Sequence, residues 1–201
     1  MKSIIIFEGP DGVGKSTQLR LLNNYFEESN FSTRCFSFPG QKDGSLGKFV
    51  YDIHHNMHSY NIQEINPASL QILHLAAHID LLEREIIPAL KEFEYILLDR
   101  YWWSLWVYGQ LNGVSLEFLE RIIDVENYKW NKIPKPVIIN LVSSAPFSKH
   151  EHGDNWSQIA NLYKKLAARE SKNSVVLNIE CADTAKKTSA DILEKIRGLE
   201  L

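Results

Sequence analysis

Cysteine is scarce in this chain. Its 201 residues include two cysteines, Cys35 and Cys181, which lie far apart and lack the paired spacing of a metal site. A framework of several disulfides and a cysteine-ligated zinc site are therefore excluded. Both thiols lie in apolar contexts, so we predict buried, reduced cysteines and a cytoplasmic protein.

The chain also lacks a strong net charge and long hydrophobic runs. Lysine plus arginine number 22 and aspartate plus glutamate number 25, so the net charge of −3 argues against a basic nucleic-acid coat. The longest apolar runs, such as residues 4–7, fall far short of the roughly 20 residues that a membrane helix needs. We therefore expect no membrane anchor and no signal peptide. No linker rich in proline, glycine or serine is present, and the length predicts a single domain over residues 1–201.

Strand-like and helix-like segments alternate along the chain. Short apolar runs bounded by polar residues, at 3–7, 34–38, 95–99, 137–142 and 174–179, are typical of fully buried parallel strands. Apolar residues at helical spacing lie between them, within residues 19–26, 70–82 and 159–166. The alternation predicts an α/β fold, in which an open parallel sheet is covered by helices on both faces and binds ligands at the carboxyl ends of its strands. Residues 39–46 and 143–155 are predicted to be irregular loops.

A phosphate-binding loop is predicted directly after the first strand. Residues 9–16 match the pattern G-x-x-x-x-G-K-[ST] at every fixed position, and an amphipathic helix follows. Backbone N–H groups of such a loop turn onto phosphate oxygens, and the helix adds the positive end of its dipole. Lys15 is expected to reach the β- and γ-phosphates, Ser16 to coordinate Mg²⁺, and Thr17 to contact the α-phosphate. The residues predicted to bind ATP are Gly9, Asp11, Gly12, Val13, Gly14, Lys15, Ser16 and Thr17.

The strand predicted at residues 95–99 ends in a carboxylate, and a guanidinium follows it. Asp99 and Arg100 therefore arrive together at the ligand edge of the sheet. We predict that Asp99 supports Mg²⁺ and that Arg100 holds a phosphate. The alternative, a surface ion pair at a strand end, is disfavoured because a buried strand delivers the pair.

With residues 7–18 (FEGPDGVGKSTQ) and 99–101 (DRY), the chain resembles the thymidylate kinase family of nucleoside monophosphate kinases. Further agreement comes from Phe38-Pro39 and from residues 87–90 and 162–166. The resemblance implies a P-loop NTPase fold with a five-stranded parallel sheet, ATP and Mg²⁺ as cofactors, and a homodimer. It also implies a small-molecule acceptor, a nucleoside monophosphate, with dTMP as the default.

The resemblance further implies which residues handle the acceptor. Asp11 matches a carboxylate that helps to organise the acceptor, beside Lys15, Asp99 and Arg100 as the other catalytic residues. Phe38-Pro39 follows the second strand, and Ser104 and Tyr108 follow the third. Together with Arg100 at the end of the third strand and Trp103 from the aromatic segment that follows it, the residues predicted to bind the substrate are Glu8, Phe38, Pro39, His74, His78, Arg100, Trp103, Ser104 and Tyr108.

Several acceptor-side positions depart from the family pattern. Ser37 stands where an arginine usually precedes the Phe-Pro pair, and Gly109 stands where a base-reading residue is usual. His74 and His78 occupy the positions of a stacking aromatic and of an arginine that holds the acceptor. Periodicity places both histidines on one helical face, where they are as compatible with a structural role as with ligand binding.

An arginine for the transition state is also missing. The family supplies it from the phosphate loop or from a lid, which here corresponds to residues 143–155, and a finger-type arginine contributes on the order of 10³–10⁵ in rate. This lid holds Lys149, with His150 and His152, but no arginine. Either Lys149 substitutes, or catalysis of the usual reaction is weak or absent. The two histidines lack the third ligand of a metal site.

Residues 101–108 form an aromatic cluster with two interpretations. Its side chains can stack on a flat acceptor, for which Trp103 and Tyr108 are the preferred candidates. They can equally pack in the core or in a dimer interface.

Two further functions stay open beside a nucleoside monophosphate kinase. Loss of the acceptor-phosphate arginines favours a kinase for an unphosphorylated acceptor, such as a nucleoside or a modified base in DNA. A local basic patch of Lys129, Lys132 and Lys135 would partly offset the net charge for DNA. The missing lid arginine also permits a nucleotide-binding module with little or no turnover.

Overall fold

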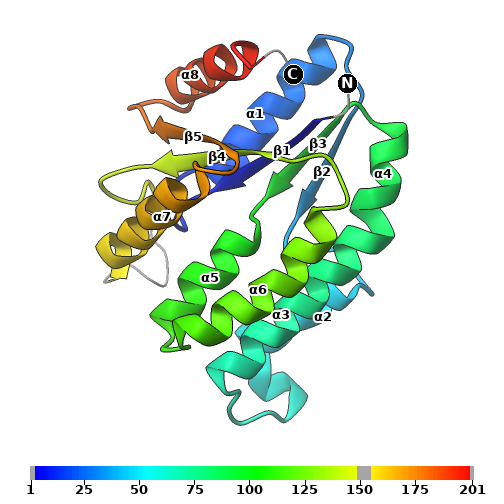
Figure 1. Cartoon of the computed structure of the whole chain (residues 1–201), viewed down its shortest axis with the longest axis vertical. Coiled ribbons are helices and arrows are strands. Elements are labelled where there is room, and N and C mark those ends of the chain that lie inside the picture. Colours follow the sequence, from blue (N-terminus) through cyan, green and yellow to red (C-terminus); the bar gives the residue numbers. More distant parts are fainter. Residues whose placement is uncertain (1–2, 149–154, 200–201) are drawn as a thin grey trace.

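The computed structural model describes residues 3–148 and 155–199. Its five strands form one parallel sheet in the order β2-β3-β1-β4-β5 (Figure 1), which confirms the predicted fold class. The strands are β1 (Ser3–Glu8), β2 (Thr33–Ser37), β3 (Tyr95–Asp99), β4 (Val137–Val142) and β5 (Val175–Glu180). The helices are α1 (Lys15–Glu28), α2 (Leu46–Asn56), α3 (Pro67–Leu81), α4 (Ile87–Glu92), α5 (Trp102–Leu111), α6 (Leu116–Trp130), α7 (Trp156–Glu170) and α8 (Ala185–Arg197).

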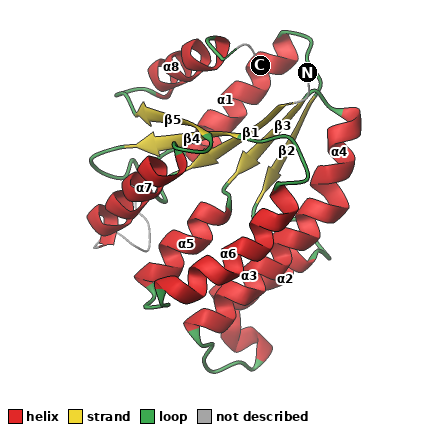
Figure 2. Cartoon of the chain, viewed as in Figure 1, coloured by secondary structure: helices red, strands yellow, loops and turns green. Residues whose placement is uncertain are grey.

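The inner strands β1, β3 and β4 are mainly apolar and buried on both sides, because helices cover both faces of the sheet (Figure 2). On β1, Ile4 and Ile6 join the core cluster that includes side chains from α3 to α7, whereas Ile5 and Phe7 join the cluster under α1 and α8. Each fully buried side chain of this size contributes about 1.5–3 kcal/mol. The continuous apolar runs in the sequence therefore reflect two cores, one on each side of the sheet.

The prediction of full burial is wrong for the two edge strands. β2 and β5 each pair on one side, and several of their residues are exposed. For the same reason the prediction of buried cysteines is wrong, because Cys35 on β2 is exposed and Cys181 directly after β5 is half-buried. Both cysteines are free.

The three segments with helical spacing form α1, α3 and α7, as predicted. A π-helical turn, η2 (Leu82–Ile86), joins α3 to α4 just before Pro88. Proline has no N–H and its ring crowds the preceding turn, so a local widening of the helix is the usual accommodation. A short 3₁₀ segment, η1 (Met57–Tyr60), follows α2. No helix among the described residues is long and apolar enough to cross a membrane.

Strand register assembles the ligand edge of the sheet. Phe7 on β1 pairs with Asp99 on β3, and Ser37 on β2 pairs with the same residue from the other side. The Arg100 N–H then donates to the Phe7 carbonyl at 2.9 Å. The loop that follows β1 therefore lies beside the Asp99-Arg100 pair.

The turn after β2 is held by the start of α2. Ser45 caps this helix by accepting a hydrogen bond from the Lys48 N–H at 3.1 Å. A Cβ atom at Gly47 would lie 2.0 Å from the Pro39 carbonyl oxygen, which is backbone and cannot yield locally. The close approach of α2 to the Phe38-Pro39 turn thus requires glycine at position 47.

We expect Gly47→Ala to lower the free energy of unfolding by about 1–3 kcal/mol, because the added methyl group forces α2 away from the turn. Urea denaturation followed by circular dichroism measures this change. Gly198→Ala is the matched control, since the nearest atom to its added Cβ lies at 3.5 Å. Equal midpoints for the two variants would contradict the steric argument.

Candidate active site

The phosphate loop has the backbone that its glycines permit. Gly9, Gly12 and Gly14 have φ values of 136°, 84° and 96°, which side chains other than glycine rarely adopt. A Cβ atom at Gly9 would lie 2.7 Å from the Leu141 carbonyl oxygen. Val13 buries its side chain in the core, so it contributes to the loop through its backbone. No side chain caps α1, so the first N–H groups of this helix are available to bind an anion.

Lys15 is buried within this loop. Its ammonium group donates to the carbonyl oxygens of Gly9 and Pro10, each at 2.9 Å, and lies 3.5 Å from Asp11. Burial, with the neighbouring Arg100 guanidinium, lowers the pKa of Lys15 to about 8. The structure thus holds this lysine at the centre of the predicted phosphate cradle.

Ser16 and Asp99 meet as the sequence predicts for a metal pair. The Ser16 hydroxyl donates to Asp99 Oδ2 at 2.5 Å. The other carboxylate oxygen, Asp99 Oδ1, is buried and has no hydrogen-bond partner among the described residues. A buried, unpaired carboxylate oxygen beside a hydroxyl suits a hard cation that retains most of its water, so these residues fit Mg²⁺.

Asp11, Arg100 and Tyr108 form a connected polar cluster. The Arg100 guanidinium donates to Asp11, and the Tyr108 hydroxyl donates to the same carboxylate at 2.7 Å. Burial by itself would raise the pKa of Asp11, but the Arg100 and Lys15 charges hold that pKa below its usual range. Asp11 therefore stays ionised and serves to accept hydrogen bonds rather than protons.

Glu8 does not line the site as predicted. It is fully buried, and its Oε1 atom accepts hydrogen bonds from the N–H groups of Tyr101 at 2.6 Å and Ser104 at 3.2 Å. Glu8 thus caps the start of α5 and positions the cluster around Arg100. Burial raises the pKa of Glu8 to about 7.

Ser104 is likewise an internal connector. Its hydroxyl bonds Glu8 Oε2 at 3.0 Å and the Tyr163 hydroxyl at 2.9 Å, and it accepts from Arg100 at 3.0 Å. Tyr163 on α7 is a partner that sequence reasoning missed, because 59 residues separate it from Ser104 and it lies within an otherwise apolar helical face.

Phe38 and His78 are packed together under the turn after β2. Their rings stack with centroids 4.1 Å apart, and both side chains are buried. His78 Nδ1 lies 3.1 Å from Glu126 Oε2, and the Trp130 indole donates to Glu126 Oε1 at 3.1 Å. We predicted that Phe38, Pro39 and His78 contact the substrate. All three are buried, so they have a structural role in this conformation. The sequence analysis missed Glu126, because the pattern of apolar residues in α6 does not indicate that this glutamate is fully buried.

His74 lies nearer the open side of α3. Its Nε2 atom is 3.1 Å from His54 Nδ1 on α2. Burial, reinforced by the neighbouring His78 and His54, lowers the pKa of His74 to about 3, so the ring is neutral at physiological pH.

Trp103 was predicted to line the acceptor pocket, and this prediction is wrong. Its side chain is fully buried in the core, and its indole N–H has no acceptor among the described residues. Tyr108, by contrast, reaches the Asp11 cluster from the next turn of α5. Lys149, His150 and His152 lie outside the described residues.

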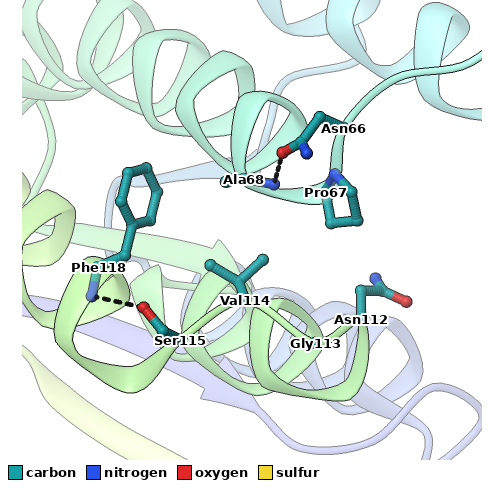
Figure 3. Close-up of a pocket in the computed structure, with 8 residues that line it drawn as sticks. All are labelled: Asn66, Pro67, Ala68, Asn112, Gly113, Val114, Ser115 and Phe118. Atoms are coloured by element: carbon teal, nitrogen blue, oxygen red, sulfur yellow. Dashed lines mark hydrogen bonds between the residues drawn. The ribbon is translucent and has the colours of Figure 1, made fainter.

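The structure has two surface cavities to compare with these residues. A cavity of about 520 Å³ has both Ser16 and Asp99 in its wall. A smaller cavity of about 270 Å³ lies between the start of α3 and the turn joining α5 to α6 (Figure 3), and none of the predicted site residues lines it. The larger cavity therefore belongs to the candidate site.

Comparisons with known proteins identify related sequences and a related fold. A family model described as thymidylate kinase matches residues 7–136. A thymidylate kinase of Thermoanaerobacter sp. (strain X514) is 30% identical over 122 residues, which cover 60% of this chain and 57% of that protein. One from Fervidobacterium nodosum is 29% identical over 184 residues, 87% of this chain and 89% of that protein. The chain thus spans little more than half the length of the first of these relatives.

The fold is similar to the crystal structure of a thymidylate kinase from Ehrlichia chaffeensis. The TM-score is 0.76 at 17% identity, and the match covers 97% of this chain and 98% of the other. At this identity the likeness concerns the fold alone. It nevertheless extends over β4, α7 and β5, beyond residue 136 where the family model ends.

We expect Glu126→Gln to destabilise the protein by about 1–3 kcal/mol, because the amide has a single acceptor oxygen where the carboxylate places one oxygen on Trp130 and the other near His78. Thermal and urea unfolding measure the loss. Glu120→Gln is the matched control, since Glu120 lies on the same helix and accepts from the Trp106 indole at 2.8 Å while being half-exposed. A similar loss in both variants would argue against a special role of Glu126.

The stability of the protein should depend on Glu8 in a pH-dependent way. Because the folded state raises the pKa of Glu8 from 4.5 to about 7, the folded state holds the proton more tightly than the unfolded state. The contribution of Glu8 to the free energy of unfolding therefore falls as pH rises from about 4.5 to 7, by on the order of 1–3 kcal/mol. Denaturation of wild type and Glu8→Gln at several pH values measures it. The difference between them should change across this window, and a constant difference would contradict the raised pKa.

Proposed function

Because the chain belongs to the thymidylate kinase family, we propose that it is an ATP-dependent kinase that transfers the γ-phosphoryl group to a nucleoside monophosphate, with dTMP as the default acceptor. The observation that carries this proposal is the meeting, at one sheet edge, of a phosphate loop, the Ser16–Asp99 pair and the Asp11–Arg100 cluster. This combination would supply phosphate binding, a cation site and an acceptor-side anchor at one edge of the sheet, although 83 residues separate Ser16 from Asp99.

Positioning and electrostatics would carry the catalysis. The loop N–H groups and Lys15 bind the donor phosphates, and Ser16 and Asp99 would hold Mg²⁺. When bound, this ion neutralises charge that develops on the phosphate oxygens. Arg100 is held by Asp11 and Ser104, so it presents a fixed positive charge. Asp11 orients Arg100 and Tyr108 through hydrogen bonds, and Glu8 acts only by positioning α5.

The test is ADP release from Mg-ATP across deoxynucleoside monophosphates, nucleosides and short DNA. We expect the highest rate with dTMP, and loss of the rate in Lys15→Ala. Activity confined to an unphosphorylated acceptor would replace this proposal with the nucleoside or DNA kinase. ATP binding without transfer to any acceptor would favour the non-catalytic module.

Asp99→Asn should lower turnover by roughly 10- to 100-fold while changing ATP affinity far less, because the amide supports a cation more weakly than the carboxylate. Steady-state kinetics and equilibrium binding of ATP separate the two effects. Asp183→Asn, on the surface after β5, is a suitable control. Unchanged turnover in Asp99→Asn would remove Asp99 from the mechanism.

We propose Lys149 as the cation that takes the place of the family's lid arginine. Lys149→Ala is expected to reduce kcat with little effect on ATP affinity, since the charge is needed only as the phosphoryl group moves. Full activity of this variant would show that Lys149 has no catalytic role.

We also propose a homodimer formed through α2, α3 and α6, which lie side by side (Figure 1). These helices expose Phe49 at 48%, Ile72 at 47% and Val125 at 51% of their surface. Apolar exposure on adjacent helices is typical of a subunit interface. Light scattering should give about twice the chain mass of 23.2 kDa.

A cytoplasmic location is proposed as well, supported by two free thiols.

A further inference from the structure

Arg100 has a backbone conformation that needs support. Its φ value is 77°, in the left-handed region that residues other than glycine rarely adopt. Such a conformation persists only where surrounding contacts hold it, and it is concentrated at functional sites. The hydrogen bond from the Arg100 N–H to the Phe7 carbonyl holds the backbone. The direction of the guanidinium depends on separate contacts of the side chain.

Two side chains hold the guanidinium. Its Nη2 atom donates to Asp11, and its Nη1 atom donates to the Ser104 hydroxyl at 3.0 Å. Asp11 belongs to the phosphate loop and is partly exposed, whereas Ser104 lies in the first turn of α5 and is buried. Ser104 is therefore the partner of Arg100 that is shielded from solvent and from a bound nucleotide.

The hydrogen-bonding capacity of the Ser104 hydroxyl is fully used. This group has one proton to donate and two lone pairs to accept with. Its three partners are Arg100, Glu8 Oε2 at 3.0 Å and the Tyr163 hydroxyl at 2.9 Å. A guanidinium only donates, and an ionised carboxylate only accepts. Ser104 therefore donates to Glu8, and Tyr163 donates to Ser104.

Tyr163 is suited to act as this donor. Its side chain is 1% exposed and comes from α7, which packs against α5. Burial, with the neighbouring Glu8 charge, raises the pKa of Tyr163 well above its ordinary value, so the hydroxyl keeps its proton. The Ser104 oxygen is thereby held by groups from β1, from the end of β3 and from α7.

We propose that Tyr163 positions Arg100 through Ser104, so that α7 contributes to phosphoryl transfer without contacting either substrate. The inference rests on the proposed function and adds a residue to it. Without the Tyr163 hydroxyl, a lone pair of the buried Ser104 oxygen is left unpaired, and Ser104 loses one of its three restraints. The guanidinium that it holds then loses its fixed direction. A misplacement of about 1 Å at a reacting centre can cost roughly 100-fold in rate.

Steady-state kinetics at about pH 8, where Glu8 is ionised, test the proposal. Tyr163→Phe should lower kcat about tenfold and change the KM for ATP by about twofold or less, since the phosphate loop is untouched. Ser104→Ala should lower kcat at least as much. In the Ser104→Ala background, Tyr163→Phe should have little further effect, because its connection to Arg100 is already broken.

Ile159→Val and Tyr25→Phe are the matched controls. Ile159 lies one turn earlier in α7 and in the same core cluster as Tyr163, so the loss of a methyl group loosens this helix without touching the hydroxyl. Tyr25 accepts a hydrogen bond from Arg197 at 2.9 Å, so Tyr25→Phe removes a tyrosine hydroxyl between two other helices. Both variants should keep the wild-type kcat. If Ile159→Val lowered kcat as much as Tyr163→Phe, looser packing of α7 would explain both losses and the inference would be wrong.

NMR of ¹⁵N-labelled arginine side chains tests the positioning without turnover. The guanidinium protons of Arg100 are identified by their absence from the spectrum of Arg100→Lys. They should exchange with water several-fold faster in Tyr163→Phe than in wild type or in Tyr25→Phe, because the Ser104 oxygen no longer holds them in place.

An unaltered kcat in Tyr163→Phe overturns the inference, and so does an equal loss of kcat in the presence and absence of the Ser104 hydroxyl. The proposed function fails separately, by the absence of ADP release from wild type with every acceptor. In that case the exchange rate of Arg100 decides the positioning: faster exchange in Tyr163→Phe supports it, and unchanged exchange overturns it.

Discussion

The parallel pairing of β1 with β3 is the constraint on which the site depends. Its register sets Phe7 opposite Asp99, and the Arg100 N–H extends the pairing to the Phe7 carbonyl. The phosphate loop leaves β1 at the same level. A shift of one residue would turn the Asp99 side chain to the other face of the sheet and separate it from Ser16. Burial of both faces of these strands prevents such a shift, so core packing fixes the position of Asp99 relative to Ser16.

The second constraint on the site is the balance between its buried positive and negative side chains. Lys15 and Arg100 lie close to the carboxylates Asp11 and Glu8, and burial affects each group differently. Asp11 faces both cations and stays ionised. Glu8 lies deeper, among backbone N–H groups and the Ser104 hydroxyl, where burial outweighs the charges. Two carboxylates three residues apart thereby have different environments: Asp11 accepts hydrogen bonds from Arg100 and Tyr108, and Glu8 caps α5.

The acceptor side of the molecule is built differently from the donor side. Around the phosphate loop, the backbone conformation is set by glycines with positive φ values. On the acceptor side, His78, Phe38, Glu126 and Trp130 form a buried polar and aromatic network that supports the turn after β2. Residues of this turn also form part of the wall of the larger cavity. Because this network is closed to solvent, it is stable only when each of its polar members is paired within the protein.

Sequence alone determined the elements whose signal is local. The glycines of the phosphate loop, the apolar runs of the strands and the polar pair ending β3 act through neighbours in the chain, so the fold class, the phosphate loop and the pairing of Ser16 with Asp99 were predictable. Tertiary structure decided what depends on distant partners. Glu8 became a helix cap and Trp103 a core residue, while Glu126 met His78 across 48 positions. Burial of these groups arises only when separate helices pack, and periodicity within one helix cannot reveal which distant side chain will cover it.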